Sequence, residues 1–206
     1  MSRLLVYCEG ATEELFIKDV LAPYLLTANI YAKPIGADGA SKYSKIKTEL
    51  TKLGKNDSQA IITTMFDYYA LPNETPGVKN ATGSLYEKIQ HIESAVNTDL
   101  GLPNVFFNLI VHEFEGLLFA DTTAFADIAN ETQLVDLAKI RQKFNSPEHI
   151  NKSYETAPSR RILGIIQNYS KVLDGTKIAK IIGINKISAE CPHFADWVKN
   201  ISPKEE

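Results

Sequence analysis

The stretch LLVYCEGATE at residues 4–13 decides the fold, because it joins a continuous apolar run to a short acidic turn. A run that is apolar at every position is typical of a strand buried on both faces of a parallel sheet. Gly10 permits a tight turn after the strand, and we expect Thr12 to be the N-cap of a helix whose first turn holds Glu13. The stretch therefore predicts strand, turn and helix, with Glu9 at the tip of the strand.

The alternation of strand and helix continues through the first half of the chain. We predict strands at 3–8, 29–35, 59–66 and 104–111, helices at 12–26, 42–53 and 84–98, and a turn at 36–39. This order indicates an α/β protein with a mostly parallel, four-stranded sheet and right-handed crossovers.

The pattern becomes helical after residue 112. We predict helices over 114–144 (with a break near 121–123), 159–168, 176–182 and 192–199, and a polar loop at 145–158. No repeat or linker interrupts the chain. We therefore expect a single domain over 1–206, with a core at 1–121 and a helical extension at 122–206.

Composition narrows the classes of function. The chain has 206 residues, 44% hydrophobic residues and a net charge of −3, so it should form a full core without any general attraction to nucleic acid. Cys8 and Cys191 lack metal-ligand spacing and are expected to be buried thiols. The sequence shows no signal peptide and no apolar stretch of 18 residues, so we expect a cytoplasmic protein that does not bind membranes.

Five acidic residues follow three of the predicted strands. They are Glu9, Glu13, Asp67, Glu113 and Glu115. If these strands are neighbours and parallel, the carboxylates meet at one edge of the sheet, where open α/β sheets bind ligands. Clustered carboxylates repel each other unless a cation neutralises them, and clusters of oxygen ligands suit Mg²⁺ or Mn²⁺. The set predicts a metal-dependent enzyme that acts on phosphates.

Each of these residues also has a simpler explanation. Glu9 is compatible with a solvated strand end, and Asp67 with the start of a turn. Glu13, Glu113 and Glu115 are compatible with the acidic first turn of a helix. His112, which precedes Glu113 in the chain, is either a hydrogen-bonded structural histidine or a proton shuttle or metal ligand.

The C-terminal half contains a basic region. Residues 151–186 carry seven Lys and Arg side chains against two acidic ones. Ser159 is an expected N-cap whose helix start would bind a phosphate, and Arg160 or Arg161 would make bidentate phosphate contacts. Lys171 and Lys180 would add to a nucleic-acid-binding surface. The alternative is a solvated basic face.

The ordered set of motifs resembles a known family. The matching segments are Val6–Glu13, Thr63–Tyr69, His112–Glu115, Glu155–Arg161 and Cys191–Phe194. A strand that ends in Glu-Gly-x-Thr-Glu, followed by a strand that ends in Asp, resembles the Toprim domain of topoisomerases, primases and overcoming-lysogenization-defect (OLD) nucleases. Over nearly its whole length the chain looks like domain-of-unknown-function family 4276, a Toprim-like bacterial group.

The resemblance implies a Toprim-like sheet flanked by helices that binds Mg²⁺ or Mn²⁺. Glu9 matches the Toprim glutamate that is often assigned as general acid/base, and Asp67 matches the first Asp of the Asp-x-Asp pair. Tyr69 stands where the second Asp is normally found, so Glu113 or Glu115 would have to replace that ligand. The family also looks like a partner of AAA-type ATPases in prokaryotic phage defence.

Our leading hypothesis is a Mg²⁺-dependent nuclease that hydrolyses DNA or RNA, together with an ATPase partner. Glu9, Asp67 and His112 would be catalytic, and the five acids would hold metal. The alternative is a catalytically weak or inactive partner or sensor subunit of an ATPase complex. A phosphotransferase ranks last, because the sequence has no Walker-type glycine-rich loop.

Overall fold

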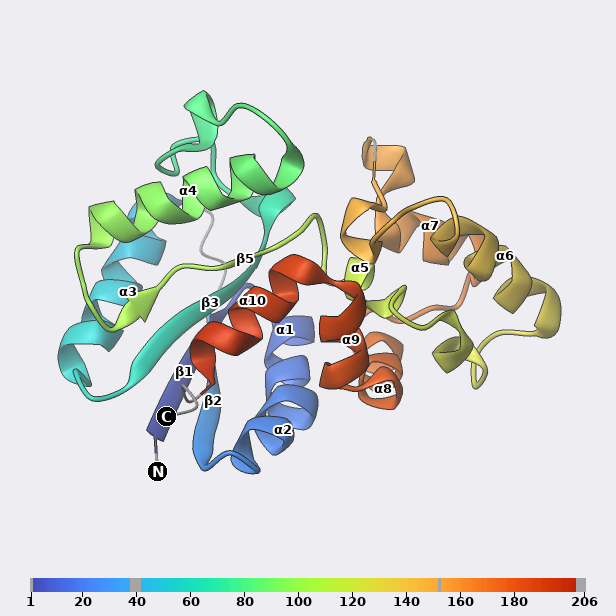
Figure 1. Ribbon diagram of the computed structural model, residues 1–206, viewed down its shortest axis with the longest axis horizontal. Helices are drawn as coiled ribbons and strands as arrows, with labels where there is room; N and C mark the ends of the chain where they lie inside the picture. The colour runs from blue at the N-terminus through green and yellow to red at the C-terminus, as the bar shows by residue number, and fades with distance from the viewer. Residues whose placement is uncertain (1, 38–41, 152, 203–206) are drawn as a thin grey trace.

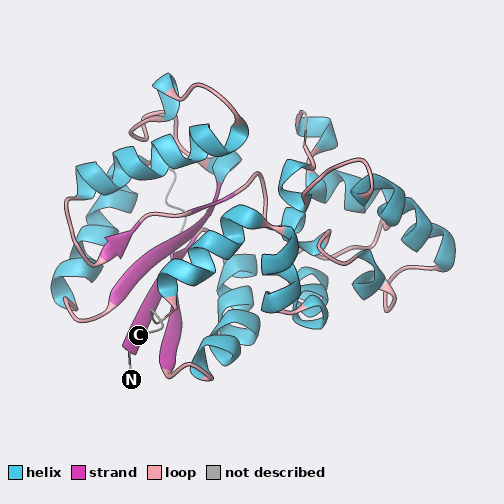
Figure 2. Ribbon diagram, in the orientation of Figure 1, coloured by secondary structure: helices cyan, strands magenta, loops and turns pink. Residues whose placement is uncertain are grey.

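A parallel sheet organises the N-terminal half of the molecule (Figures 1 and 2). The computed structural model describes residues 2–37, 42–151 and 153–202. The strands are β1 (Ser2–Cys8), β2 (Ile30–Gly36), β3 (Ile61–Asp67), β4 (Val105–Phe106) and β5 (Leu109–Ile110). They run in the order β2-β1-β3-β4, with β5 also paired to β3, and every pairing is parallel. The predicted fold class, an α/β protein with a parallel sheet and C-terminal helices, is confirmed.

The register of the strands brings their carboxyl ends to one edge. Cys8 of β1 lies opposite Met65 of β3, and Asp67 of β3 lies opposite Ile110 of β5. The residues that directly follow β1 and β5 therefore flank the end of β3. This is the edge at which we expected the acidic side chains to meet.

The fourth predicted strand, 104–111, is interrupted. The side chain of Asn97 accepts a hydrogen bond from the backbone N–H of Phe107 at 2.7 Å. The Thr64 hydroxyl accepts from the N–H of Asn108 at 2.8 Å and donates to the Asn108 carbonyl at 2.6 Å. Because side chains take the place of a neighbouring strand here, the ladder breaks into β4 and β5.

Helices cover both faces of the sheet. Helices α1 (Ala11–Phe16) and α2 (Ala22–Leu26), joined by a π-helical turn (Ile17–Leu21), pack with Leu4, Val6 and Cys8 of β1 in one core cluster. Helices α3 (Tyr43–Asn56) and α4 (Leu85–Leu100) pack with Tyr7 in a second cluster. Alternate residues of β1 thus enter different cores, which explains why the strand is apolar from Leu4 to Cys8.

The helix after β1 differs from the prediction at its start. Its N-cap is Gly10 instead of Thr12, and the Glu13 carboxylate accepts the Gly10 N–H at 2.9 Å. The π-helical turn inside the predicted 12–26 segment was also not expected. The predicted turn at 36–39 lies partly outside the described residues.

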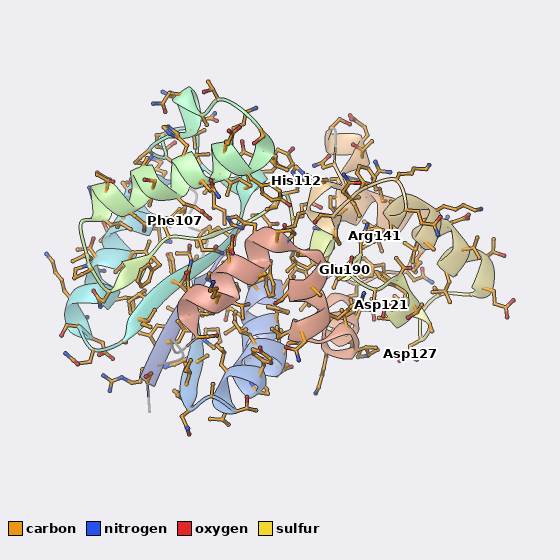
Figure 3. All side chains as sticks on the ribbon, in the orientation of Figure 1. Phe107, His112, Asp121, Asp127, Arg141 and Glu190 are labelled. Atoms are coloured by element: carbon orange, nitrogen blue, oxygen red, sulfur yellow. The ribbon has the colours of Figure 1, made fainter. Side chains whose placement is uncertain are left out.

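The C-terminal part is built of short helices. They are α5 (Glu115–Leu118), α6 (Glu131–Arg141), α7 (Pro158–Ile165), α8 (Leu173–Ile182), α9 (Ile184–Glu190) and α10 (Pro192–Ile201), with 3₁₀ turns at Thr122–Phe125, Pro147–His149 and Tyr154–Thr156. Further 3₁₀ turns at Tyr68–Ala70 and Val78–Asn80 lie earlier in the chain, between β3 and α4. The predicted helical segment 114–144, with a break near 121–123, is made of α5, the 3₁₀ turn at Thr122–Phe125 and α6, so much of its middle is not α-helical, and α9 was not predicted. The ion pair between Arg141 and Glu190, 2.6 Å long, connects α6 to the end of α9 (Figure 3).

The C-terminal helices share a core with the sheet. Phe194 and Trp197 of α10 belong to the same cluster as Val6 of β1, and the Trp197 indole donates to the Thr63 hydroxyl of β3 at 3.0 Å. The division of the chain at residue 121 stays a prediction. Both cysteines are buried and free, as expected, and none of the described helices has the length and hydropathy of a membrane span.

Candidate functional site

The acidic side chains surround the end of β3. Asp67 is the last residue of β3, and its pKa is raised well above the usual value by burial and by the negative charges of Glu9, Glu13, Glu115 and Glu113. All five predicted carboxylates therefore lie in one electrostatic neighbourhood. Their roles as metal ligands stay predictions.

Backbone N–H groups hold three of these carboxylates in place. The Asp67 N–H donates to Glu9 Oε2 at 2.9 Å, and the Phe114 N–H donates to Asp67 Oδ1 at 3.0 Å. The Ser159 N–H donates to Glu113 Oε2 at 3.0 Å. Within the described part of the chain, the second oxygen of each of these three carboxylates receives no hydrogen bond. Each side chain is thus oriented while it keeps one oxygen for a ligand.

Glu13 has a structural role and also belongs to the acidic cluster. Its carboxylate binds the Gly10 N–H at the start of α1, as expected of an acid in the first turn of a helix. Burial raises the pKa of Glu13 to about 7, and the charges of Glu9 and Glu115 act in the same direction. An acid in the first turn of a helix does not normally titrate near neutral pH, so burial, with a smaller contribution from the neighbouring acids, distinguishes Glu13 from such a residue.

Lys171 brings a positive charge to the cluster. Its Nζ lies 3.2 Å from Glu115 Oε1. Glu115 is buried, which raises its pKa although Lys171 opposes the shift. Burial by itself would lower the pKa of Lys171, but the charges of Glu115, Glu113 and Asp67 outweigh burial, and the pKa is raised. One lysine thus offsets part of the negative charge of five acids.

His112 is buried under an exposed tyrosine. It has a left-handed backbone, with φ of 66°, and its ring stacks on Tyr69 with the centroids 5.0 Å apart. Burial lowers the pKa of His112 to about 4, helped by nearby His149. The ring is therefore neutral at physiological pH, and its Nδ1 has no hydrogen-bond partner among the described residues. A catalytic role of His112 stays a prediction.

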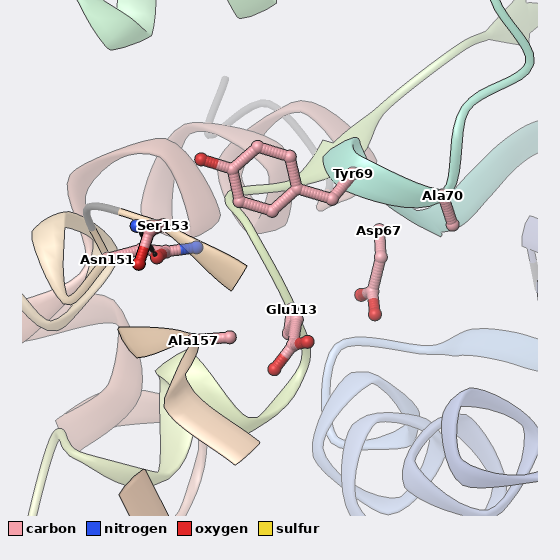
Figure 4. A pocket seen from close by; sticks show the side chains of 7 residues that line it. All are labelled: Asp67, Tyr69, Ala70, Glu113, Asn151, Ser153 and Ala157. Carbon is pink, nitrogen blue, oxygen red and sulfur yellow. Dashed lines mark hydrogen bonds between the residues drawn. The ribbon is translucent and has the colours of Figure 1, made fainter. Parts of the chain in front are cut away.

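A pocket of about 430 Å³ opens beside the carboxylates (Figure 4). It is lined by Asp67, Tyr69, Ala70, Glu113, Asn151, Ser153 and Ala157. The Tyr69 ring borders one side, and the carboxylates of Asp67 and Glu113 border another. Tyr69, which the motif resemblance places where a second Asp is expected, thus borders the candidate site with an aromatic ring.

The predicted phosphate-binding residues are placed differently from what we expected. Helix α7 has Ala157 as its N-cap, with Pro158 at its first position, so Ser159 is not the cap. The N–H of Ser159, which we expected to face a phosphate, instead binds Glu113. The helix start therefore orients a carboxylate of the cluster.

The basic side chains do not converge on the pocket. Arg161 Nε donates to the Thr156 carbonyl at 2.7 Å, and its guanidinium lies over the Phe144 ring. Arg160 and Lys180 are exposed, and neither lines the pocket as far as the structure describes it. Among the predicted bases, Lys171 alone is paired with the acidic cluster in the described residues.

The donor set has the chemistry of a divalent-metal site. All of its side chains are carboxylates, they repel each other, and one oxygen on each of Asp67 and Glu113 is free to bind a cation. In the described residues, however, no three His, Cys, Asp or Glu side chains are arranged closely enough to hold a metal ion. The residue types fit Mg²⁺ or Mn²⁺, and their arrangement does not form a closed coordination site.

Several residues of the site could not be found from the sequence. Asn151, Ser153 and Ala157 lie in what reads as a polar loop, and nothing in its pattern indicates that it faces β3. Lys171 was predicted to contact nucleic acid, but its pairing with Glu115 has no sequence signal. These contacts depend on how the C-terminal helices pack against the sheet.

The fold and the site define an α/β protein with a largely buried acidic cluster at the carboxyl edge of a parallel sheet. The chain belongs to the family described as Domain of unknown function (DUF4276), whose model matches residues 8–202. The family predicted from the sequence motifs is thereby confirmed.

Two solved structures of the C-terminal region of the OLD protein of Xanthomonas campestris pv. campestris are similar to the chain. The structure phased with iodine is 15% identical with a TM-score of 0.41, and the one phased with platinum is 16% identical with a TM-score of 0.42. Both matches cover 97% of this chain, and 97% and 95% of the respective OLD chains. Similarity at this level does not indicate a shared activity. No curated protein matches the chain.

Proposed function

We propose that the protein is a Mg²⁺- or Mn²⁺-dependent nuclease that hydrolyses phosphodiester bonds of DNA or RNA. The observation that carries the proposal is the concentration of negative charge around Asp67, whose pKa is raised by burial and by four neighbouring carboxylates. Such an arrangement is costly without a cation, and strongly perturbed acids beside a pocket are typical of functional sites.

Asp67 and Glu113 are the proposed primary metal ligands. Both line the pocket, and both keep one carboxylate oxygen that receives no hydrogen bond within the described residues. Glu9, Glu13 and Glu115 are proposed to complete or support the ligand set. A bound divalent cation would polarise a phosphate oxygen and lower the pKa of a water molecule.

Glu9 is the proposed general acid/base. Burial raises its pKa, although its hydrogen bond from the Asp67 N–H and the charge of Lys171 oppose the shift. A buried carboxylate with a raised pKa can accept a proton from the attacking water and return it to the leaving oxygen. Hydrolysis then consumes one water, breaks one P–O bond and leaves a phosphomonoester and a hydroxyl end.

The remaining predicted residues would bind the substrate or support the residues that do. Lys171 lies near the acids and would compensate the charge of the phosphate. Arg160, Arg161 and Lys180 are proposed to attract the nucleic-acid backbone outside the pocket, and Ser159 to act indirectly by orienting Glu113. His112 is neutral, so any catalytic role would be as a hydrogen-bonding group beside Tyr69.

A nuclease assay tests the proposal. Supercoiled plasmid, single-stranded DNA and RNA are incubated with purified protein and Mg²⁺ or Mn²⁺, with and without a candidate ATPase. We expect cleavage that is lost in Asp67→Asn and Glu113→Gln and kept in Asp136→Asn, a change at an exposed acid of α6. If the wild-type protein leaves every substrate intact under all these conditions, the proposal fails.

A second candidate function is a non-catalytic partner or sensor subunit of an AAA-type ATPase complex in phage defence. Two observations favour it. Tyr69 stands at the position of a metal-binding Asp, and no three acids are arranged for a metal ion in the described residues. Calorimetry that finds no divalent-metal binding, together with a stable complex with the ATPase, would support this function over the nuclease.

A further inference from the structure

The side chain of Tyr69 is largely exposed, although two neighbouring rings pack against it. It is 57% exposed, but its ring stacks on His112 with an interplanar angle of 20° and on Tyr68 with an angle of 29°. Tyr68 in turn packs against the second core cluster. The ring therefore has a fixed position although it contributes little to the core.

His112, on which Tyr69 stacks, has two features that are energetically unfavourable. His112 is buried with a left-handed backbone, which a residue other than glycine rarely adopts, and its Nδ1 lacks a partner in the part of the chain that the structure describes. A residue in such a conformation is kept only where its surroundings enforce it, and such residues concentrate at functional sites. In this protein, His112 holds the ring of Tyr69 at the edge of the pocket.

The pocket also contains a hydrogen-bond donor, the side-chain amide of Asn151. Asn151 Oδ1 already accepts from the Ser153 N–H at 3.0 Å and from the Thr156 hydroxyl at 3.3 Å. Its Nδ2 has no acceptor among the described residues, so this amide is a spare donor. Asp67 and Glu113 border the same pocket (Figure 4), so a ligand beside Tyr69 also lies near the proposed metal ligands.

We infer that Tyr69 packs against the base of an unpaired nucleotide next to the phosphate to be cleaved. The inference rests on the proposed nuclease function and names its substrate class: single-stranded or locally unpaired nucleic acid. Aromatic side chains bind unpaired bases of any sequence by stacking. A base inside an intact duplex is stacked and paired, so it cannot reach the ring without being extruded.

Base binding can be measured without cleavage. A short single-stranded oligonucleotide that carries the fluorescent base 2-aminopurine is titrated with protein in the absence of divalent metal. We expect binding with quenching of the fluorescence by the wild-type protein. Tyr69→Ala should weaken binding about 10-fold and remove the quenching, whereas Tyr69→Phe and Tyr69→Trp, which keep a ring, should keep both.

Tyr31→Ala is the matched control. Tyr31 is 55% exposed and lies near the start of β2, at the opposite end of the sheet from the acids, so its removal should leave binding unchanged. Equal affinity and quenching in Tyr69→Ala and the wild-type protein would overturn the inference.

Cleavage of matched substrates separates this inference from the nuclease proposal. We expect single strands, and duplexes with a short unpaired bulge, to be cut at least 10-fold faster than the fully paired duplex, with Tyr69→Ala reducing this preference. If duplex and single strand are cut equally and Tyr69→Ala has no effect, the nuclease proposal stands and the inferred base-binding role of Tyr69 fails. If Tyr69-dependent quenching is found but nothing is cleaved, the base-binding role of Tyr69 stands and the nuclease proposal fails.

Discussion

Two groups of acidic side chains are largely removed from water in this protein, and they are satisfied in opposite ways. Around Glu148, three donors meet one carboxylate: the Tyr86 hydroxyl at 2.9 Å, the His193 N–H at 3.0 Å and the Phe194 N–H at 2.9 Å. Glu93 nearby accepts the Leu109 N–H at 2.8 Å and faces the His193 ring. These acids fasten the start of α10 and an interrupted strand.

The acids at the end of β3 have fewer donors and more negative neighbours. Among the described residues, Glu9, Asp67 and Glu113 each receive a single backbone hydrogen bond, and Lys171 pairs with Glu115 alone. Burial and mutual repulsion raise the pKa of Asp67. Buried acids whose oxygens are occupied by hydrogen-bond donors stabilise the fold. Buried acids that have few donors are suited to bind a cation or a proton.

The largest difference between the two groups should appear in catalysis. Asp67→Asn removes a proposed metal ligand and should lower nuclease activity by about 1,000-fold or more, the size of effect seen when central catalytic groups are removed. Because the change also relieves repulsion among the acids, the free energy of unfolding without metal should not fall. Parallel cleavage assays and urea denaturation measure both quantities. A lower free energy of unfolding in Asp67→Asn would show that Asp67, like Glu148, stabilises the fold.

Glu148→Ala should have the opposite profile. It leaves the Tyr86 hydroxyl and two N–H groups of α10 without acceptors, so we expect a loss of about 4 kcal/mol in the free energy of unfolding. At temperatures where the variant is folded, its cleavage rate per folded molecule should stay within a few-fold of the wild type. Denaturation curves and rates at low temperature test this, and an unchanged denaturation midpoint would contradict it.

The pH dependence of stability should distinguish Glu13 from a simple helix-start acid. Its pKa is raised to about 7 in the folded protein, so the folded state binds the proton more tightly than the unfolded state. The stability contribution of this proton is present below about pH 4.5 and is lost as the pH rises through 7.

Glu13→Gln removes this titration and keeps an acceptor for the Gly10 N–H. We expect the variant to match the wild type near pH 4 and to exceed its unfolding free energy by about 3 kcal/mol near pH 8. Urea denaturation at the two pH values is the measurement. If the variant and the wild type differ by the same amount at both pH values, the pKa of Glu13 is not raised in the folded protein.

The smallest effect is expected at Lys171. Lys171→Met removes the charge that faces Glu115, but the lysine is 48% exposed and its ion pair is screened by solvent. We expect a loss of about 1 kcal/mol in the free energy of unfolding near pH 8. Lys177→Met changes an exposed lysine of α8 and serves as the control, with an expected change below about 0.5 kcal/mol. Equal effects of the two substitutions would mean that Lys171 does not stabilise the cluster.

The sequence predicted the acidic edge because its cause is local. Apolar runs end directly before Glu9 and at Asp67, and parallel strands bring such ends together. The interrupted strand could not be predicted in the same way. It depends on side chains of Asn97 and Thr64, which come from a helix and from another strand.

The C-terminal contacts were predicted least well, for a related reason. Ser159 looked like an N-cap, but Pro158 occupies the first position of α7 and moves the cap to Ala157. The N–H of Ser159 then meets Glu113, which is 46 residues earlier in the chain. Local propensity marks where helices form, whereas the surfaces that face the pocket are decided by packing.

Binding of Mn²⁺ tests the central proposal most directly. Isothermal titration calorimetry at pH 8 compares the wild-type protein with Asp67→Asn and with Glu148→Gln, which changes an acid of the satisfied group. We expect saturable Mn²⁺ binding to the wild type and to folded Glu148→Gln, and its loss in Asp67→Asn. A wild-type protein that binds no Mn²⁺, or that binds it equally well after Asp67→Asn, would contradict the assignment of the acidic edge as a metal site.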